Sequence, residues 1–151
     1  RSLYMSKTTL VGLIVAAGAV VFFSGCGASG AQFSQFATPK QDRGLVYVYR
    51  PESFVGGGVY YDIHVTNPST PDFIAGELVN GSYVEIDIPS GESEVWGKTE
   101  SKSSVTLDVK KGEIYCVKGG VGIGFFVGRP NLEIVDMDTC KKEIVETRLT
   151  K

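Results

Sequence analysis

Short segments in which apolar residues occupy every second position constrain this chain more than any other feature. Residues 84–88 read V-E-I-D-I, and residues 105–109 read V-T-L-D-V. Because neighbouring side chains of an extended strand point to opposite faces, this alternation gives each segment one apolar face. Turn-forming residues separate the segments, including Asn-Gly at 80–81 and Pro-Ser-Gly at 89–91. The pattern predicts antiparallel strands joined by tight turns.

Such segments recur roughly every ten residues along the chain, which is typical of an antiparallel sandwich or barrel. We predict an all-β fold, an antiparallel immunoglobulin-like β-sandwich over residues 44–151. Two prolines within residues 67–72 predict a loop there. Residues 143–149 fit either a short C-terminal helix, with Asp138 or Thr139 near its start, or an edge strand. The helix is the favoured interpretation.

The N-terminal segment is organised like an export signal. Lys7 supplies a positive charge, residues 10–23 form an uncharged apolar run, and two small residues precede Cys26. A basic start, an apolar core and small residues before the cleavage site define a secretory signal peptide. We therefore predict a signal peptide over residues 1–25, in which residues 1–4 are an upstream extension.

The end of this segment, F-S-G-C at residues 23–26, resembles the lipobox of bacterial lipoproteins. The resemblance implies cleavage before Cys26 and attachment of acyl chains, palmitate among them, to that cysteine. Lipobox sequences usually carry Leu where this chain has Phe23, which is a modest departure. The alternative is a transmembrane anchor over residues 8–24, which at about 17 residues falls short of the ~20 that a bilayer requires.

The residues after Cys26 bear on localisation. The next residue is Gly27 rather than Asp, which by resemblance to enteric sorting rules favours the outer membrane, with the domain facing the periplasm. Residues 26–43 are small and polar and lack periodicity. We predict that they form a flexible tether that lets the domain stand away from the bilayer.

The remaining cysteines leave two possibilities open. If Cys26 is lipidated, Cys116 and Cys140 form an even pair in an oxidising compartment and can form a disulfide. Alternatively, Cys116 is a small buried apolar residue and Cys140 is a free thiol. No metal site or other cofactor is expected, because these cysteines and His64 lack the spacing of zinc ligands.

Charge argues against some classes of partner. The chain has 15 basic and 17 acidic residues and a formal net charge of −2. Proteins that bind nucleic acid through its phosphates need a basic patch, and none stands out in the sequence. The sequence equally lacks a cluster of basic residues that would bind anionic lipid, so the predicted membrane attachment depends on the N-terminal lipid.

Patterns of the kinds found in catalytic sites have simpler explanations here. Residues 119–124 are rich in glycine but lack the spacing and the Lys-Ser/Thr pair of a nucleotide loop, and they fit a flexible or bulged strand connection. His64 shares one face of its segment with Asp62, but no nucleophile is recognisable, and a surface histidine is the simpler interpretation. Carboxylates two residues apart, such as Glu92 and Glu94, fit the solvated face of a sheet. We therefore expect no enzyme activity.

Aromatic residues give the better indication of binding. Phe125 and Phe126 lie between glycines, with Arg129 nearby, and we predict a patch for a partner there. The leading hypothesis is a non-enzymatic module that contacts another envelope component, either a protein or the cell wall. The alternative is a glycan or small-ligand binding module in which Trp96 and tyrosines stack on the ligand. The candidate aromatic residues for a recognition surface are Tyr47, Tyr49, Tyr61, Tyr83, Trp96, Phe125 and Phe126, and we expect most of these rings to lie in the core.

Two family resemblances accompany these patterns. The sequences N-G-S-Y at 80–83, I-D-I-P-S-G-E at 86–92 and L-D-V-K-K-G-E-I-Y-C-V at 107–117 resemble the repeat of PEGA-type surface domains. This resemblance implies a PEGA-like β-sandwich as the alternative to an immunoglobulin-like one. L-V-Y-V-Y-R-P at 45–51 and G-F-F-V-G-R-P at 124–130 look like a family of bacterial lipoproteins known only as a domain of unknown function. The second resemblance implies a β-domain facing the periplasm and assigns no catalytic residue.

Overall fold

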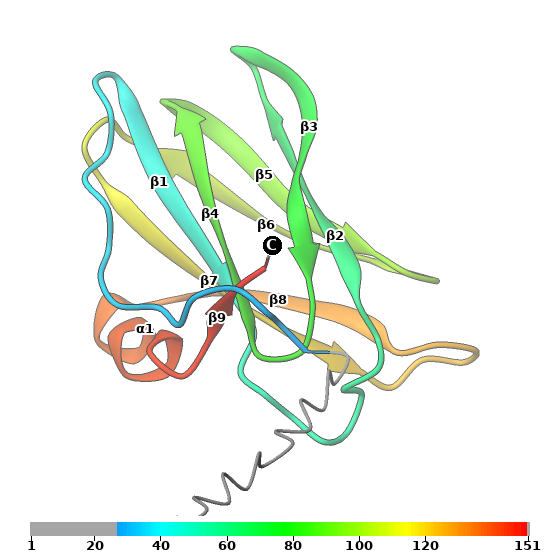
Figure 1. The fold of residues 1–151 in the computed structure, drawn as a ribbon. Helices are drawn as coiled ribbons and strands as arrows, with labels where there is room; N and C mark the ends of the chain where they lie inside the picture. Colours follow the sequence, from blue (N-terminus) through cyan, green and yellow to red (C-terminus); the bar gives the residue numbers. More distant parts are fainter. Residues whose placement is uncertain (1–26, 151) are drawn as a thin grey trace, which may run out of the picture.

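Two β-sheets packed face to face form a sandwich in the computed structural model, which describes residues 27–150 (Figure 1). Cys26 and the predicted signal peptide lie outside the described residues. In chain order the elements are β1 (Arg43–Tyr49), β2 (Tyr61–Asn67), β3 (Thr70–Leu78), β4 (Ser82–Pro89), β5 (Gly91–Lys98), β6 (Lys102–Val109), β7 (Ile114–Gly122), β8 (Arg129–Val135), α1 (Met137–Ile144) and β9 (Arg148–Leu149). The predicted all-β sandwich with a short C-terminal helix is confirmed.

The strands pair mainly in antiparallel fashion. The first sheet has the order β8-β7-β1-β4-β9 and the second has the order β3-β2-β5-β6. Two pairings are parallel, β1 with β7 and β4 with β9, which the purely antiparallel expectation did not include. Between β1 and β7 the chain forms β4 of the first sheet and all four strands of the second sheet. It then returns to the first sheet as β7, which lies beside β1 and runs in the same direction.

Alternating apolar residues build the core between the two sheets. In β4, for example, Val84, Ile86 and Ile88 are buried while Glu85 is exposed, as period-two alternation predicts. The side chains of this core are Val46, Val48, Tyr61, Ile63, Val65, Leu78, Val84, Ile86, Ile88, Val95, Leu107, Val109, Val117 and Leu132.

A second apolar cluster covers the outer face of the first sheet. Because β1 is central, Leu45, Tyr47 and Tyr49 are buried on the face opposite to the inter-sheet core. Helix α1 and the chain before β1 provide the cover, and Phe33 packs edge-on against Tyr47 with ring centroids 5.9 Å apart. Burial raises the pKa of Tyr47 to about 12, although its hydroxyl accepts a hydrogen bond from the backbone N–H of Ala37.

The prediction of a flexible tether over residues 26–43 is wrong for the part that carries Phe33. The backbone N–H of Gly30 donates to the carbonyl of Leu149 at 2.9 Å, and that of Phe33 donates to the carbonyl of Thr147 at 2.9 Å. The segment lacks periodicity because it does not form a regular strand, but its aromatic side chains still have an apolar surface to cover.

The C-terminal helix begins earlier than predicted. Asp136 caps α1, since its carboxylate accepts hydrogen bonds from the backbone N–H and the hydroxyl of Thr139 at 2.8 and 2.9 Å. These hydrogen bonds lower the pKa of Asp136. The helix ends at Ile144, and the edge strand β9 follows, so the interval 143–149 contains parts of both predicted alternatives.

Two segments predicted as loops or irregular connections belong to strands. Only residues 68 and 69 turn the chain. Strand β3 tolerates Pro71 because β3 is an edge strand and because its pairing with β2 is irregular there, so that Pro71 has no partner in the register. Gly119 to Gly122 pair regularly with β8. A Cβ on Gly119 would lie 2.5 Å from Leu78 Cδ2, so glycine there permits close packing of the sheets.

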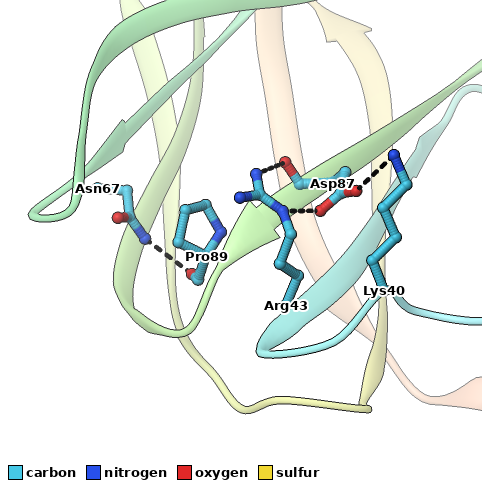
Figure 2. A network of polar contacts seen from close by, with 5 residues as sticks. All are labelled: Lys40, Arg43, Asn67, Asp87 and Pro89. Atoms are coloured by element: carbon cyan, nitrogen blue, oxygen red, sulfur yellow. Dashed lines mark hydrogen bonds and ion pairs between the residues drawn. The ribbon is translucent and has the colours of Figure 1, made fainter.

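The end of the sandwich near Pro89 is polar (Figure 2). Figure 2 shows the side chains of Arg43 and Lys40 directed at Asp87, with which both form ion pairs. Asn67 of β2 donates to the carbonyl of Pro89 at 3.0 Å, which joins the second sheet to the first. The exposed turn 110–113 adds two lysines and a glutamate at the same end. We refer to this region as the polar end.

We predict that Phe33→Ala will lower the free energy of unfolding by about 3 kcal/mol, because truncation of a buried phenylalanine leaves a cavity. Urea denaturation followed by circular dichroism measures the change. Gln35→Ala is the control, since Gln35 is exposed in the same segment and its replacement should leave stability unchanged. Equal stability of the two variants would show that this segment does not pack on the sheet.

Candidate functional site

Exposed hydrophobic side chains gather in two loops, 51–60 between β1 and β2 and 123–128 between β7 and β8. Seven of the eleven large hydrophobic side chains that are exposed within residues 27–150 belong to these loops. Apolar side chains concentrated on a surface mark a site of interaction. The seven are Phe54, Val55, Tyr60, Ile123, Phe125, Phe126 and Val127.

Both loops lie at the end of the sandwich opposite to the polar end. Strand β7 runs parallel to β1, so the connections that follow the two strands leave the first sheet at the same end (Figure 1). Val121 links them, because its side chain lies where a Cβ on Gly56 or on Gly128 would be placed. Gly56 also has a positive φ of 75°, which favours glycine. We call the surface formed by loops 51–60 and 123–128 the apolar end.

A buried cation holds the first loop. The guanidinium of Arg50 donates to the carbonyl of Val59 at 2.6 Å and to that of Gly56 at 2.8 Å, and only 2% of the residue is exposed. Burial lowers the pKa of Arg50. A buried charge is costly unless it is hydrogen-bonded, so these two bonds fix the path of the loop that carries Phe54.

A carboxylate holds the second loop. Glu100, in the turn between β5 and β6, accepts hydrogen bonds from the backbone N–H groups of Phe125 and Phe126, the latter at 3.1 Å. It also accepts one from Arg129 Nε at 2.9 Å. The bond from Phe126 and the pairing with Arg129 lower the pKa of Glu100. The loop is therefore fixed to the second sheet with both phenylalanine rings in solvent.

Two further polar contacts support the base of the second loop. The Thr99 hydroxyl donates to the carbonyl of Gly128 at 2.8 Å. The Tyr61 hydroxyl donates to the carbonyl of Gly120 at 2.8 Å, and burial raises the pKa of this tyrosine to about 12. Tyr61 thus remains a protonated donor at neutral pH.

The described chain begins beside this end. Gly27 lies close to Asn80, whose carbonyl oxygen is 3.6 Å from the position of a Cβ on Gly27. The Asn80 side chain exchanges hydrogen bonds of 2.8 and 2.9 Å with the backbone of Ser53, the neighbour of Phe54. A groove runs between the first described residues and the ends of β2 and β3. It is lined by Gly27, Ala28, Ser29, Tyr60, Gly76, Glu77, Val79 and Thr150.

The predicted partner patch is assembled only in part. Phe125 and Phe126 are 81% and 89% exposed and lie edge to face with centroids 4.7 Å apart. Because they belong to a loop, both rings can point into solvent, whereas two adjacent strand residues would face opposite ways. Arg129 is held by Glu100, so it positions the loop and does not offer an unpaired cation.

The stacking surface of the alternative hypothesis is largely buried. Tyr47, Tyr49 and Tyr61 have at most 3% of their surface exposed and Tyr83 is half-buried, so these rings belong to the core, as expected for most of them, and do not form a stacking surface. Trp96 lies on the outer face of the second sheet, where the His64 ring stacks on it with centroids 3.9 Å apart. Lys102 Nζ, from the other neighbouring strand, lies 4.6 Å from the Trp96 ring centroid. These neighbours leave little free ring surface for a ligand.

The two cysteines form a disulfide between β7 and α1, which is the bonded alternative of the sequence analysis. Cys116 and Cys140 are buried and 24 residues apart in sequence. The bond ties α1 to the outer face of the first sheet and lies outside the apolar end. It is a structural feature of the domain.

Within residues 27–150, no group of three or more His, Cys, Asp and Glu side chains is arranged to hold a metal ion. None of the helices in that range has the length and hydropathy to cross a membrane.

Sequence reasoning did not identify Phe54, Val55, Arg50 or Glu100 as parts of the site. The three glycines at 56–58 beside Phe54 were the available signal, since they indicate a loop tip next to an aromatic residue. Nothing local marks Glu100, because its partners lie 25 and 26 residues further along the chain.

Comparison with known proteins identifies a significant relative. No family model and no solved structure matches the chain. A Haemophilus influenzae protein, named only as uncharacterized, is 29% identical over 111 residues. The alignment covers 73% of this chain and 62% of that protein, so the chain spans less than two thirds of its relative. The resemblances to PEGA-type domains and to bacterial lipoproteins stay predictions.

We predict that Cys116→Ala combined with Cys140→Ala will lower the free energy of unfolding by about 3 kcal/mol, since a disulfide closing a loop of this length restricts the unfolded chain. Urea denaturation of the oxidised protein measures the loss, and the wild type in reductant is the control. If Cys116 and Cys140 can both be alkylated when the protein is unfolded without reductant, the two residues do not form a disulfide.

We predict that Glu100→Gln will loosen loop 123–128. A glutamine has a single neutral acceptor in place of the carboxylate, so the amides of Phe125 and Phe126 should exchange with solvent several-fold faster at neutral pH. Hydrogen exchange measured by mass spectrometry or NMR tests this. Glu92→Gln, an exposed position at the other end of β5, is the matched control.

Acidification should have the same effect on the wild type. The pKa of Glu100 is lowered in the folded protein. The stabilisation that its carboxylate gives to loop 123–128 is therefore complete above the ordinary glutamate pKa, and it is lost as the pH falls through the lowered pKa. Amide chemical shifts of Phe125 and Phe126, followed by NMR against pH, report the transition. The shifts should follow a single titration that is absent from Glu100→Gln.

Proposed function

We propose that this chain is a lipid-anchored protein of the bacterial cell envelope that acts as a non-enzymatic binding module. The proposed anchor is an acylated Cys26, which becomes the first residue once residues 1–25 are removed. The F-S-G-C sequence at 23–26 supports this assignment, because small residues precede the cysteine and an apolar run precedes them. Two or three acyl chains hold a protein stably at a membrane, whereas one chain does so only marginally.

One observation carries the binding part of the proposal, the apolar end itself. Water-exposed phenylalanines are unfavourable for an isolated soluble domain, and here they sit on loops fixed by Arg50 and Glu100. Hydrogen bonds that hold such side chains in solvent pre-organise a surface for a partner. We assign the role of this surface to contact with another component of the envelope.

The proposed location is the outer membrane, with the domain in the periplasm. Gly27 after the acylated cysteine supports the outer membrane. The disulfide between Cys116 and Cys140 is consistent with an oxidising compartment.

Metabolic labelling tests the anchor. The chain from Met5 is expressed in a bacterial host that processes lipoproteins, in medium containing an alkyne analogue of palmitate. We expect label on the wild type and none on Cys26→Ser. The double substitution Cys116→Ala and Cys140→Ala keeps Cys26 and should remain labelled, which controls for acylation of another thiol. An unlabelled wild type with the mass of an intact leader would refute the anchor.

A further inference from the structure

We infer that the apolar end rests in the headgroup region of the same membrane that holds the lipid on Cys26. The surface therefore has a lipid bilayer as its partner, and the domain lies on the membrane instead of standing away from it. This inference rests on the proposed acylation of Cys26. It concerns the exposed rings of Phe54, Phe125 and Phe126 and their aliphatic neighbours.

The start of the described chain fixes which end faces the membrane. Residues 30–33 are hydrogen-bonded to the C-terminal segment, so slack between the anchor and the domain is limited to a few residues. Gly27 already lies beside Asn80, which is bonded to Ser53 of the apolar end. Consecutive Cα atoms are about 3.8 Å apart, so the residue that carries the proposed lipid is joined to the domain directly beside Gly27.

The chemistry of the loops suits a membrane interface. Loop 123–128 has no side chain that is charged at neutral pH, and Glu52 is the only such side chain in loop 51–60. Glu100 and Arg129 below the second loop are paired with each other. Phenylalanine and aliphatic side chains favour the boundary between headgroups and acyl chains, where each removes apolar surface from water.

The backbone limits the depth of insertion. Irregular backbone cannot enter hydrocarbon with unsatisfied N–H and carbonyl groups. Glu100 satisfies the amides of Phe125 and Phe126 and Thr99 satisfies the carbonyl of Gly128, but the other backbone polar groups at the tip of the loop need water or headgroups. We therefore place the rings about 5–10 Å into the interface, at the level of the headgroup–acyl boundary.

The polar end favours a bilayer over a protein as the partner. Lys40, Arg43 and Asp87, with the turn 110–113, make the opposite end of the sandwich ionic (Figure 2). Contact of the apolar end with lipid would direct these charges away from the membrane into water. The acyl chains on Cys26 would also keep lipid at the apolar end at all times, whereas a protein partner would have to compete with it.

Fluorescence quenching of the acylated protein, purified from a host that processes lipoproteins and placed in vesicles, tests the inference. Trp96→Phe removes the native tryptophan, and Phe126→Trp or Ile74→Trp then places a single reporter. Ile74 is the matched control, because it is an exposed apolar residue in the middle of β3 and outside the apolar end. The vesicles contain phosphatidylethanolamine and phosphatidylglycerol with ordinary or brominated acyl chains. The acyl mass on Cys26 is measured first by mass spectrometry.

We expect brominated lipid to lower the emission of the Phe126→Trp protein about twofold and to leave the Ile74→Trp protein unchanged, since only the first reporter reaches the acyl boundary. Acrylamide, which stays in the water, should quench the Ile74→Trp protein more strongly than the Phe126→Trp protein. Phe125→Trp provides a second reporter, and circular dichroism verifies the fold of each variant.

Three results would overturn the inference. Equal quenching of both reporters by acrylamide, with no effect of bromine, would place the apolar end in water. Shielding of the Phe126→Trp reporter from both quenchers would mean that a second copy of the chain covers it. Either result leaves the lipid anchor intact. Absence of acyl mass on Cys26 would overturn the anchor and the inference together.

Discussion

Burial of β1 on both faces is the constraint on which the rest of the domain depends. Val46 and Val48 face the second sheet, while Tyr47 and Tyr49 face outward and would be exposed if the sandwich ended there. The protein covers them with α1 on one side and with Phe33 and its neighbours on the other. An N-terminal segment that appears featureless in sequence is therefore part of the fold, and its packing determines where the chain leaves the domain.

A small number of polar side chains convert loose connections into a defined surface. Arg50 and Glu100 make hydrogen bonds to the backbone of loops that carry almost no secondary structure of their own. Each acts from outside the loop that it holds, Arg50 from the end of β1 and Glu100 from a turn of the other sheet. The hydrophobic rings contribute nothing to the core, so their presentation depends on these polar anchors.

The sequence predicted the strands well because period-two alternation and turn residues are local signals. Residues 84–88 and 105–109 fall in β4 and β6, where alternate side chains are buried as expected. The helix start was misplaced because its capping residue, Asp136, directly follows a strand. The prolines at 68 and 71 suggested a longer loop than exists, since whether a strand lies at an edge is not visible in sequence.

The candidate site was less predictable, since it depends on contacts between distant segments. Phe125 and Phe126 were identified from their position between glycines, whereas Phe54 joins them only through the parallel pairing of β1 and β7. Burial of Tyr47 and Tyr61 likewise follows from the position of their strands in the sheets. Residue type alone could not distinguish a recognition tyrosine from a core one.

The pairing of the first described residues with the last has a consequence for the order of folding. Gln32 bridges Arg148, and Gly30 bonds to Leu149, so the two extremities of the domain lie against each other. Contacts between residues so far apart along the chain form late and slow the folding of a domain. The outer face of β1 is therefore fully covered only after the final residues of the domain have been synthesised, so the domain completes its fold as a whole and not segment by segment.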